Sequence, residues 1–103
     1  MKSARYRRAA RVDLDRIADE GEARWGREAA EAYVRAINRS LQSLLEFPGM
    51  GSDRSHARPH LRKWTVEAHH AYYQVDDAGI DVIRILHPSA DALKAFSGDS
   101  GPQ

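Results

Sequence analysis

The hydrophobic period of this chain changes once, at Phe47-Pro48-Gly49. Before that point apolar residues recur every three or four positions, as they do on one face of a helix. After it, β-branched and aromatic residues come in short runs that are typical of strands. Proline cannot continue a helix, and it disfavours the helical conformation of the residue before it. The sequence therefore predicts helices first and strands second, which is an α+β domain.

Two amphipathic helices are predicted before the break. The first begins at Arg8, and Gly26 separates it from a second helix over residues 27–46. The opposite face of the first helix carries Arg, Asp and Glu side chains and is expected to be solvated. A short link between two such helices makes an antiparallel helical hairpin. Its apolar stripes consist of Ala10, Leu14, Ile17, Ala18, Gly21 and Trp25 in the first helix, and of Ala30, Tyr33, Ile37, Leu41 and Leu44 in the second.

The second half of the chain is expected to cover these stripes with a sheet. A short strand is predicted over residues 3–7, a loop over 49–59, and strands over 61–68, 71–75 and 80–87. Asp76-Asp77-Ala78-Gly79 joins the last two as a hairpin, with glycine where a positive φ is needed. The last strand is an almost unbroken apolar run, as expected of a central strand covered on both faces.

The predicted architecture is an N-terminal helical hairpin packed on one face of a small, mainly antiparallel β-sheet. A helical turn is expected over residues 91–96, and the Gly/Ser/Pro-rich end is expected to be frayed. We therefore predict a single domain over residues 1–96 and a flexible C-terminal tail over residues 97–103. A chain of 103 residues has room for one domain.

Composition excludes several kinds of site. The chain has no cysteine, so disulfides, thiolate metal ligands and cysteine nucleophiles are ruled out, which suits a reducing cytoplasm. No apolar run is long enough to span a bilayer, and the basic N-terminus lacks the apolar segment of a signal peptide. We expect a cytoplasmic protein with no membrane partner.

The charge of the chain is unevenly distributed. The net charge is +1, but residues 1–16 and 54–63 are basic and residues 19–31 are acidic. This pattern is compatible with a surface that faces a polyanion and equally with ordinary solvated charge.

The five histidines do not form a recognisable metal motif. His69 and His70 are adjacent, so on a strand their side chains point to opposite faces and do not readily share an ion. The chain also lacks a nucleophile elbow and the glycine patterns of phosphate-binding loops. No metal ion and no cofactor are expected.

Basic and aromatic residues gather on the three predicted strands of the second half. Arginine can contact phosphate and aromatic rings can stack on bases, so this set could form a nucleic-acid-binding patch. We favour the alternative that Trp64 and Tyr73 belong to the core, and that Arg62 and Arg84 form structural or partner-binding ion pairs. The full set is Arg58, Arg62, Lys63, Trp64, Tyr72, Tyr73, Arg84 and His87.

An ordered series of short motifs over residues 5–91 resembles the ParE-like toxins of the ParE/RelE superfamily. Residues 9–17 match its A-x-x-D-L-x-x-I opening, and residues 44–51 match L-x-x-x-P-x-x-G. Leu61-Arg62 resembles the L-R that enters a strand, and Tyr73-Gln74-Val75 stands where Y-x-V is usual. Residues 83–91 match R-[IV]-L-H-x-x-x-D, while His69-His70 departs from the family pattern.

This resemblance implies the toxin of a type II toxin-antitoxin system with a RelE/ParE-like fold. It implies that a ParD-like antitoxin neutralises the toxin and that the toxin inhibits DNA gyrase by non-catalytic binding, through the sheet face and the C-terminal segment. RelE-type toxins instead cleave mRNA on the ribosome, where Arg62 and Arg84 would stabilise the phosphate and His87 would act as acid or base. No tyrosine follows His87, which favours the ParE alternative. An interaction domain without toxicity is a third possibility, and direct binding of nucleic acid is left open.

We further expect the antitoxin to lay an amphipathic segment along a groove between the helical hairpin and the sheet. The expected lining is apolar, with arginines at its polar edge. The predicted residues are Leu14, Ile17, Tyr33, Ile37, Leu41 and Leu44, with Arg58 and Arg62 at the edge.

Overall fold

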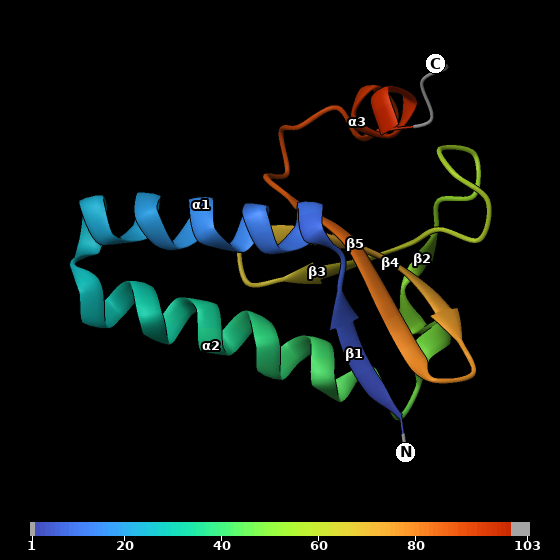
Figure 1. The fold of residues 1–103 in the computed structure, drawn as a ribbon, viewed down its shortest axis with the longest axis horizontal. Coiled ribbons are helices and arrows are strands. Elements are labelled where there is room, and N and C mark those ends of the chain that lie inside the picture. The colour runs from blue at the N-terminus through green and yellow to red at the C-terminus, as the bar shows by residue number, and fades with distance from the viewer. Residues whose placement is uncertain (1, 100–103) are drawn as a thin grey trace.

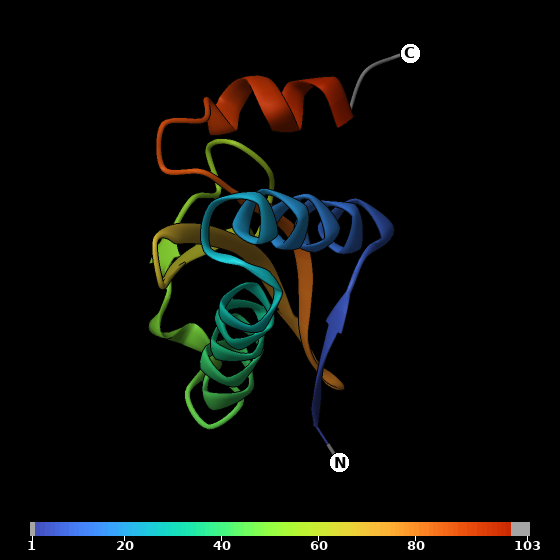
Figure 2. The same cartoon turned by 90° about the vertical axis from the view of Figure 1, so that its left-hand side faces the viewer.

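The computed structural model describes residues 2–99, together with the side chains of residues 2–96. Two long antiparallel helices lie beside a twisted sheet, and a third, short helix lies apart from them (Figures 1 and 2). The elements are β1 (Ser3–Tyr6), α1 (Arg8–Trp25), α2 (Arg27–Ser43), the 3-10 turn η1 (Pro48–Met50), β2 (Ser52–Asp53), β3 (Arg62–Val66), β4 (His69–Asp76), β5 (Gly79–Leu86) and α3 (Ala92–Asp99). The predicted α+β fold, a helical hairpin on a mainly antiparallel sheet, is confirmed.

The sheet has five strands in the order β1-β5-β4-β3-β2. β1 pairs in parallel with β5, and every other neighbouring pair is antiparallel. The strand pair β4–β5 is the expected hairpin, and Gly79 at its turn has a φ of 129°. A side chain there would collide with the backbone of Ser3, so glycine is also required for β1 to approach β5.

Several predicted boundaries are wrong. β2 lies in the segment predicted as loop, β3 ends at Val66, β4 begins at His69, and β5 ends at Leu86. Glu67 adopts a positive φ of 53° and turns the chain one residue before the predicted end of the strand. α2 ends at Ser43 instead of residue 46, because the next two backbone N–H groups bond to carbonyls three residues back and tighten the chain before the proline.

Two separate layers of side chains pack on the two faces of the sheet. Between the helical hairpin and the sheet lie Ala10, Ile17, Ile37, Leu41, Leu44, Val66, Ala71, Tyr73, Ile80, Val82 and Ile85. On the opposite face α3 packs through Phe96 against Leu61, Tyr72, Ile83 and Leu86. β5 therefore has apolar side chains on both faces, as its sequence predicts. Tyr72 pairs with Arg84 and Tyr73 with Val82, so Ile83 is an extra residue that forms a bulge.

The C-terminal helix is longer than the predicted turn over residues 91–96, because α3 continues to Asp99. The tail predicted over residues 97–103 therefore begins within α3, and its residues 100–103 lie outside the described residues. Within the described part of the chain, no helix combines the length and the apolar character needed to cross a bilayer.

Candidate functional site

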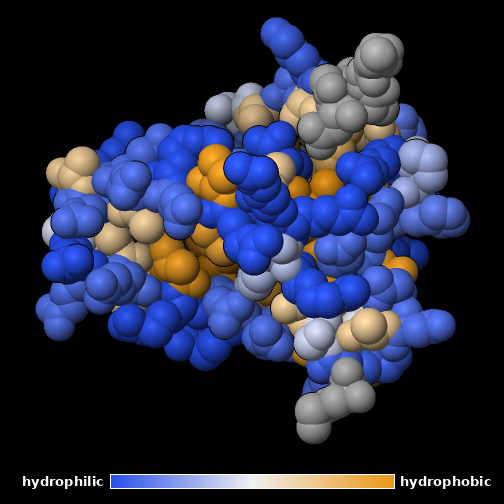
Figure 3. Space-filling model, in the orientation of Figure 1, coloured by the Kyte–Doolittle hydropathy of each residue, from blue (hydrophilic) through white to orange (hydrophobic). Residues whose placement is uncertain are grey.

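The outer side of the helical hairpin carries an apolar depression of about 400 Å³, which we call the helix groove. In Figure 3 hydrophobic surface is visible between α1 and α2. The floor comes from half-buried Leu14 on α1 and Val34 on α2. Arg35, Asn38 and Arg39 complete the lining.

The rim of the helix groove is cationic. Arg35 and Arg39 lie four residues apart on α2, and neither guanidinium forms an ion pair with a described carboxylate. Asn38 is held in place because its Oδ1 accepts a hydrogen bond of 2.6 Å from the hydroxyl of Tyr6. An apolar floor with a positive rim suits an amphipathic segment that carries acidic residues.

The groove predicted between the hairpin and the sheet is not open in this structure. Ile37, Leu41 and Leu44 are at most 2% exposed and form part of the core, because the sheet covers this part of the helical stripe. Of the other predicted residues, Leu14 lines the helix groove, while Ile17 and Tyr33 line a different depression near the end of the hairpin. Arg58 lies half-buried in the loop before β3, and Arg62 lies at the start of that strand.

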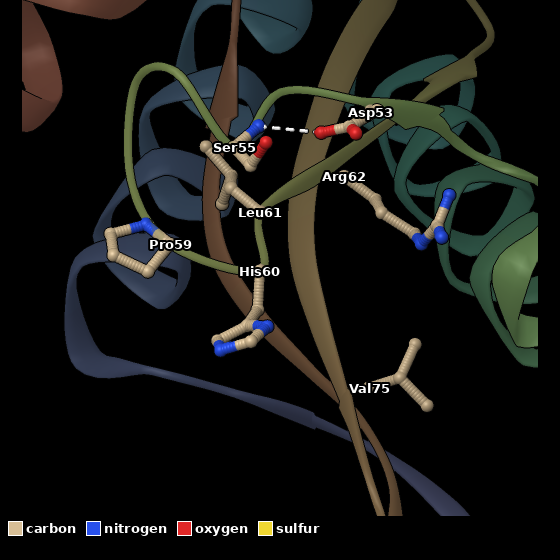
Figure 4. A pocket seen from close by; sticks show the side chains of 7 residues that line it. All are labelled: Asp53, Ser55, Pro59, His60, Leu61, Arg62 and Val75. Carbon is tan, nitrogen blue, oxygen red and sulfur yellow. Dashed lines mark hydrogen bonds between the residues drawn. The ribbon is translucent and has the colours of Figure 1, made fainter.

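A depression of about 660 Å³ lies beside the loop before β3, and we call it the loop pocket (Figure 4). In Figure 4 the guanidinium of Arg62 points away from the Ser55–Pro59 side of the loop. Its Nη1 donates hydrogen bonds of 3.1 and 2.8 Å to the carbonyls of Gly49 and Gly51. Arg62 thus fixes η1 against the sheet instead of forming an ion pair. The pocket is lined by Asp53, Ser55, Pro59, His60, Leu61, Arg62 and Val75.

A buried ion pair joins α1 to β5. Asp13 is 0% exposed, although its sequence position predicts the solvated face of the helix. Its carboxylate accepts hydrogen bonds from Arg84 Nε at 2.8 Å and Arg84 Nη2 at 3.0 Å. It also accepts from the backbone N–H of Ile85 at 2.8 Å, next to the bulge, and from Arg16 at 3.1 Å. The predicted structural ion pair of Arg84 is therefore present, with an unexpected partner.

A third depression, about 240 Å³, lies where the α1–α2 turn meets the β3–β4 turn. We call it the imidazole cleft, because His69 and His87 both line it. Burial, reinforced by the nearby His87, lowers the pKa of His69, although Glu20 opposes the shift. Trp25, which was predicted to face the core, is 54% exposed at the mouth of this cleft. The lining consists of Ile17, Glu20, Gly21, Arg24, Trp25, Tyr33, Ala68, His69 and His87.

The three residues considered for phosphoryl chemistry do not share a depression. Arg62 lines the loop pocket, His87 lines the imidazole cleft, and Arg84 is bound to Asp13. An endoribonuclease centre would need these groups around one phosphate. Tyr72 and Tyr73 are buried, and Trp64 is half-buried against α2, so the aromatic residues of the predicted patch mainly serve the two cores.

The sheet face considered for partner binding is covered in part by α3. Phe96 of α3 is 2% exposed and packs edge-on against Tyr72. Leu93 on the same helix is 51% exposed, so α3 turns one apolar side chain outward. The outer surface of α3 is therefore accessible on this side of the molecule, as is the sheet at Thr65, which is exposed on the same face as Tyr72.

The sequence analysis did not single out Val34, Arg35 and Arg39, which line the helix groove. The available signal was the position of Val34, an apolar residue directly beside Tyr33 of the predicted stripe. An apolar residue beside the stripe lies at the edge of the helix–sheet contact, where it remains half-buried.

Known proteins similar to this chain share one description. The family model described as ParE toxin of type II toxin-antitoxin system, parDE, matches residues 4–92. Toxin ParE1 of Caulobacter vibrioides is 36% identical over 92 residues, which cover 89% of this chain and 95% of that protein. Toxin ParE1 of Mycobacterium tuberculosis is 35% identical over 84 residues, which cover 81% of this chain and 86% of that protein.

A similar solved structure is described as the chromosomal ParDE TA system from P. aeruginosa. It aligns with a TM-score of 0.72 at 29% identity and covers 84% of this chain and 96% of that chain. The residues matched by the family model include the helix groove and the imidazole cleft, and they end at residue 92, where α3 begins.

Proposed function

Because this chain belongs to the ParE toxin family of type II toxin-antitoxin systems, we propose that a ParD-like antitoxin neutralises it and that the free toxin inhibits DNA gyrase. The inhibition is by binding, without catalysis by the toxin itself. Family membership is the observation that carries this proposal. The separation of Arg62, Arg84 and His87 supports binding over RNA cleavage, because these groups do not surround a common phosphate.

The helix groove is the proposed docking site for the antitoxin. Its floor, Leu14 and Val34, can receive apolar side chains of an amphipathic segment, since both residues are half-buried and line an open depression. Arg35 and Arg39 have no described carboxylate partner and can pair with acidic residues on the polar side of that segment. The groove thus supplies both the apolar contact that gives affinity and the charges that orient the bound segment.

The outer surface of α3 is the proposed contact with gyrase. α3 covers part of the sheet, and Leu93 near the beginning of this helix is 51% exposed there. An exposed large apolar side chain is a reasonable anchor for a protein interface. Because α3 and the helix groove are formed by different elements, this arrangement allows separate variants to affect the two partners.

The first test is a supercoiling assay with purified gyrase and the full chain. The proposal expects loss of supercoiling or accumulation of cleaved plasmid, with recovery when the antitoxin is added. An unaffected gyrase combined with ribosome-dependent cleavage of mRNA would contradict the proposal and favour the RelE-type alternative.

The docking site is tested with a matched pair of substitutions, Val34→Asp and Val12→Asp. Both introduce a carboxylate for valine on the hairpin, but Val34 lines the helix groove and Val12 is 51% exposed outside it. Val34→Asp is expected to weaken antitoxin binding by about tenfold or more, a loss of about 1.4 kcal/mol, while Val12→Asp leaves it unchanged. Calorimetric titration measures both affinities. Equal affinities for the two variants would place the antitoxin elsewhere.

A further inference from the structure

Four aromatic rings form a row along the imidazole cleft, from the α1–α2 turn to the end of β5. The ring centroids of Trp25 and Tyr33 are 5.5 Å apart, those of Tyr33 and His69 are 5.7 Å apart, and those of His69 and His87 are 6.0 Å apart. The proposed partner sites do not use this row, and the position of His69 departs from the family pattern. The row connects three segments that are distant in sequence.

The hydroxyl of Tyr33 joins α2 to the β3–β4 turn. It accepts a hydrogen bond of 3.0 Å from the backbone N–H of Ala68, and it lies 2.8 Å from His69 Nδ1. A hydroxyl has one proton to donate, and His69 Nδ1 is the acceptor that lies within its reach among the described side chains. The Ala68 N–H, the Tyr33 hydroxyl and His69 Nδ1 are all satisfied when Nδ1 accepts the proton of the hydroxyl. In that arrangement the imidazole of His69 is neutral and carries its proton on Nε2.

His87 is held in the same tautomer by its own loop. The backbone N–H of Ser89 lies 3.1 Å from His87 Nδ1, and the Ser89 hydroxyl lies 2.7 Å from it. A backbone N–H can only donate, so His87 Nδ1 must accept. The two imidazoles are therefore both bonded as neutral rings, and their planes meet edge to face at 89°.

We propose that Tyr33, His69 and His87 form a proton-sensitive latch, which ties the α1–α2 turn to the β3–β4 turn at neutral pH and releases it when His69 is protonated. A proton on His69 Nδ1 reverses this hydrogen bond, because Nδ1–H then donates to the Tyr33 oxygen and competes there with the backbone N–H of Ala68. It also places a positive charge beside a second imidazole. Tyr33 packs at the edge of the hairpin core, whereas His69 and His87 are not among its residues, so release opens the imidazole cleft on the His69 side while the core stays packed.

The charges around His69 mostly oppose its protonation. Burial is the largest cause of its lowered pKa, His87 adds to the shift, and His70 contributes least in the same direction. Glu20 alone among these neighbours favours the charged ring. The groups that face His69 or line its cleft are Arg16, Glu20 and Arg24 on α1, Tyr33 on α2, His70 on β4, and His87 after β5.

The direction of the pH response follows from linkage. The open state has a histidine pKa near 6.5, and the closed state has a lower one, so the open state binds more protons. The latch is fully closed above about pH 6.5 and weakens as the pH falls below that value. If opening takes up one proton, the equilibrium constant for opening rises by up to about tenfold for each unit by which the pH falls. This rise ends when the pH reaches the pKa of His69 in the closed state.

Amide hydrogen exchange in the full-length chain measures this opening at Ala68, whose N–H bonds to Tyr33. After correction for intrinsic exchange, we expect protection at Ala68 to fall by up to about fivefold between pH 6.5 and 5.5. Protection in β5 should stay unchanged. His69→Asn supplies an amide oxygen near the position of Nδ1 and cannot titrate, so its Ala68 protection should be independent of pH. His56→Asn, in an exposed loop, is the matched control and should keep the wild-type response.

Two outcomes would overturn the latch. One is the same pH profile at Ala68 in wild type and His69→Asn. The other is loss of protection at Ala68 and in β5 together, which would mean global unfolding. If His69→Asn does not fold, the titration of the wild-type histidines by NMR decides. The proposal requires a midpoint for His69 below about 6.5, the usual value of an unperturbed histidine, and an equal or higher midpoint rejects it.

Discussion

Replacement of Asp13 by alanine should be the most damaging change of a charged residue in the described part of this protein. The carboxylate is fully buried, and it accepts hydrogen bonds from the guanidinium of Arg84 and the backbone N–H of Ile85. After substitution, Arg84, whose side chain is 19% exposed, loses its described ion-pair partner, and the N–H of Ile85 loses its acceptor.

The expected loss can be worked from these contacts. Removal of one partner from a buried ion pair costs about 3–5 kcal/mol, since the other charge remains buried. An orphaned buried N–H costs about 1–3 kcal/mol. The two losses share one carboxylate and do not add fully, so we expect about 4–6 kcal/mol in total. A domain of this size is stable by about 5–15 kcal/mol, so a large part of its stability would be lost.

Urea unfolding of the full chain, followed by circular dichroism, measures this loss. Asp15→Ala is the matched control, because Asp15 is an exposed acid on the same helix. Asp13→Asn should lose less than Asp13→Ala, because the amide oxygen can still accept from the N–H of Ile85. The double variant Asp13→Ala/Arg84→Met should recover stability relative to Asp13→Ala, because it also removes the largely buried guanidinium that Asp13 neutralises.

The reasoning would be refuted if Asp13→Ala cost less than about 1 kcal/mol, the size of an ordinary neutral hydrogen bond. It would also be refuted if the losses of Asp13→Ala and Arg84→Met simply added in the double variant.

The expected loss of stability also affects how activity measurements are interpreted. Substitution of Arg84 is expected to destabilise the fold, so a loss of toxicity on Arg84→Ala would not by itself identify a catalytic residue.

Three further predictions concern single positions. Gly79→Ala should cost about 1–3 kcal/mol in urea unfolding, because Gly79 has a φ of 129° and a methyl group would collide with Ser3; an unchanged midpoint would contradict the parallel β1–β5 pairing. Tyr73→Phe should cost about 1–3 kcal/mol in the same assay, because the Tyr73 hydroxyl is the described acceptor for the N–H of Gly51. Leu93→Ser should weaken gyrase inhibition and leave the thermal unfolding midpoint unchanged, because Leu93 is 51% exposed; full inhibition by this variant would exclude it as an anchor.

The helical hairpin and the β4–β5 hairpin were predictable because their signals are local. The apolar stripe of α2 and the glycine that ends the Asp76–Gly79 turn depend on neighbouring residues in the sequence. β2 was not predictable, since its two residues become a strand through pairing with Lys63 and Arg62. The early end of β3 depends on a positive φ at Glu67, a residue type that gives no such signal.

The candidate site was less predictable than the fold, because it depends on contacts between distant residues. Asp13 resembles any acid on the solvated face of a helix until β5 brings Arg84 to it, 71 residues along the chain. The predicted groove assigned Ile37 to a partner surface, but the sheet covers it fully. Periodicity identifies which face of a helix is apolar, whereas it does not say whether that face meets the domain's own sheet or another protein.

The central place of β5 has a consequence for the order in which the protein can assemble. β5 lies between β1 and β4, so the first strand to be synthesised finds its pairing partner only when Gly79–Leu86 has been made. Until then the growing chain has a helical hairpin whose apolar stripes lack most of their cover. Closing contacts of such long sequence separation costs chain entropy and slows folding. The domain therefore acquires its native shape only after β5 has been made, and a chain interrupted before β5 is expected to be a substrate for proteolysis.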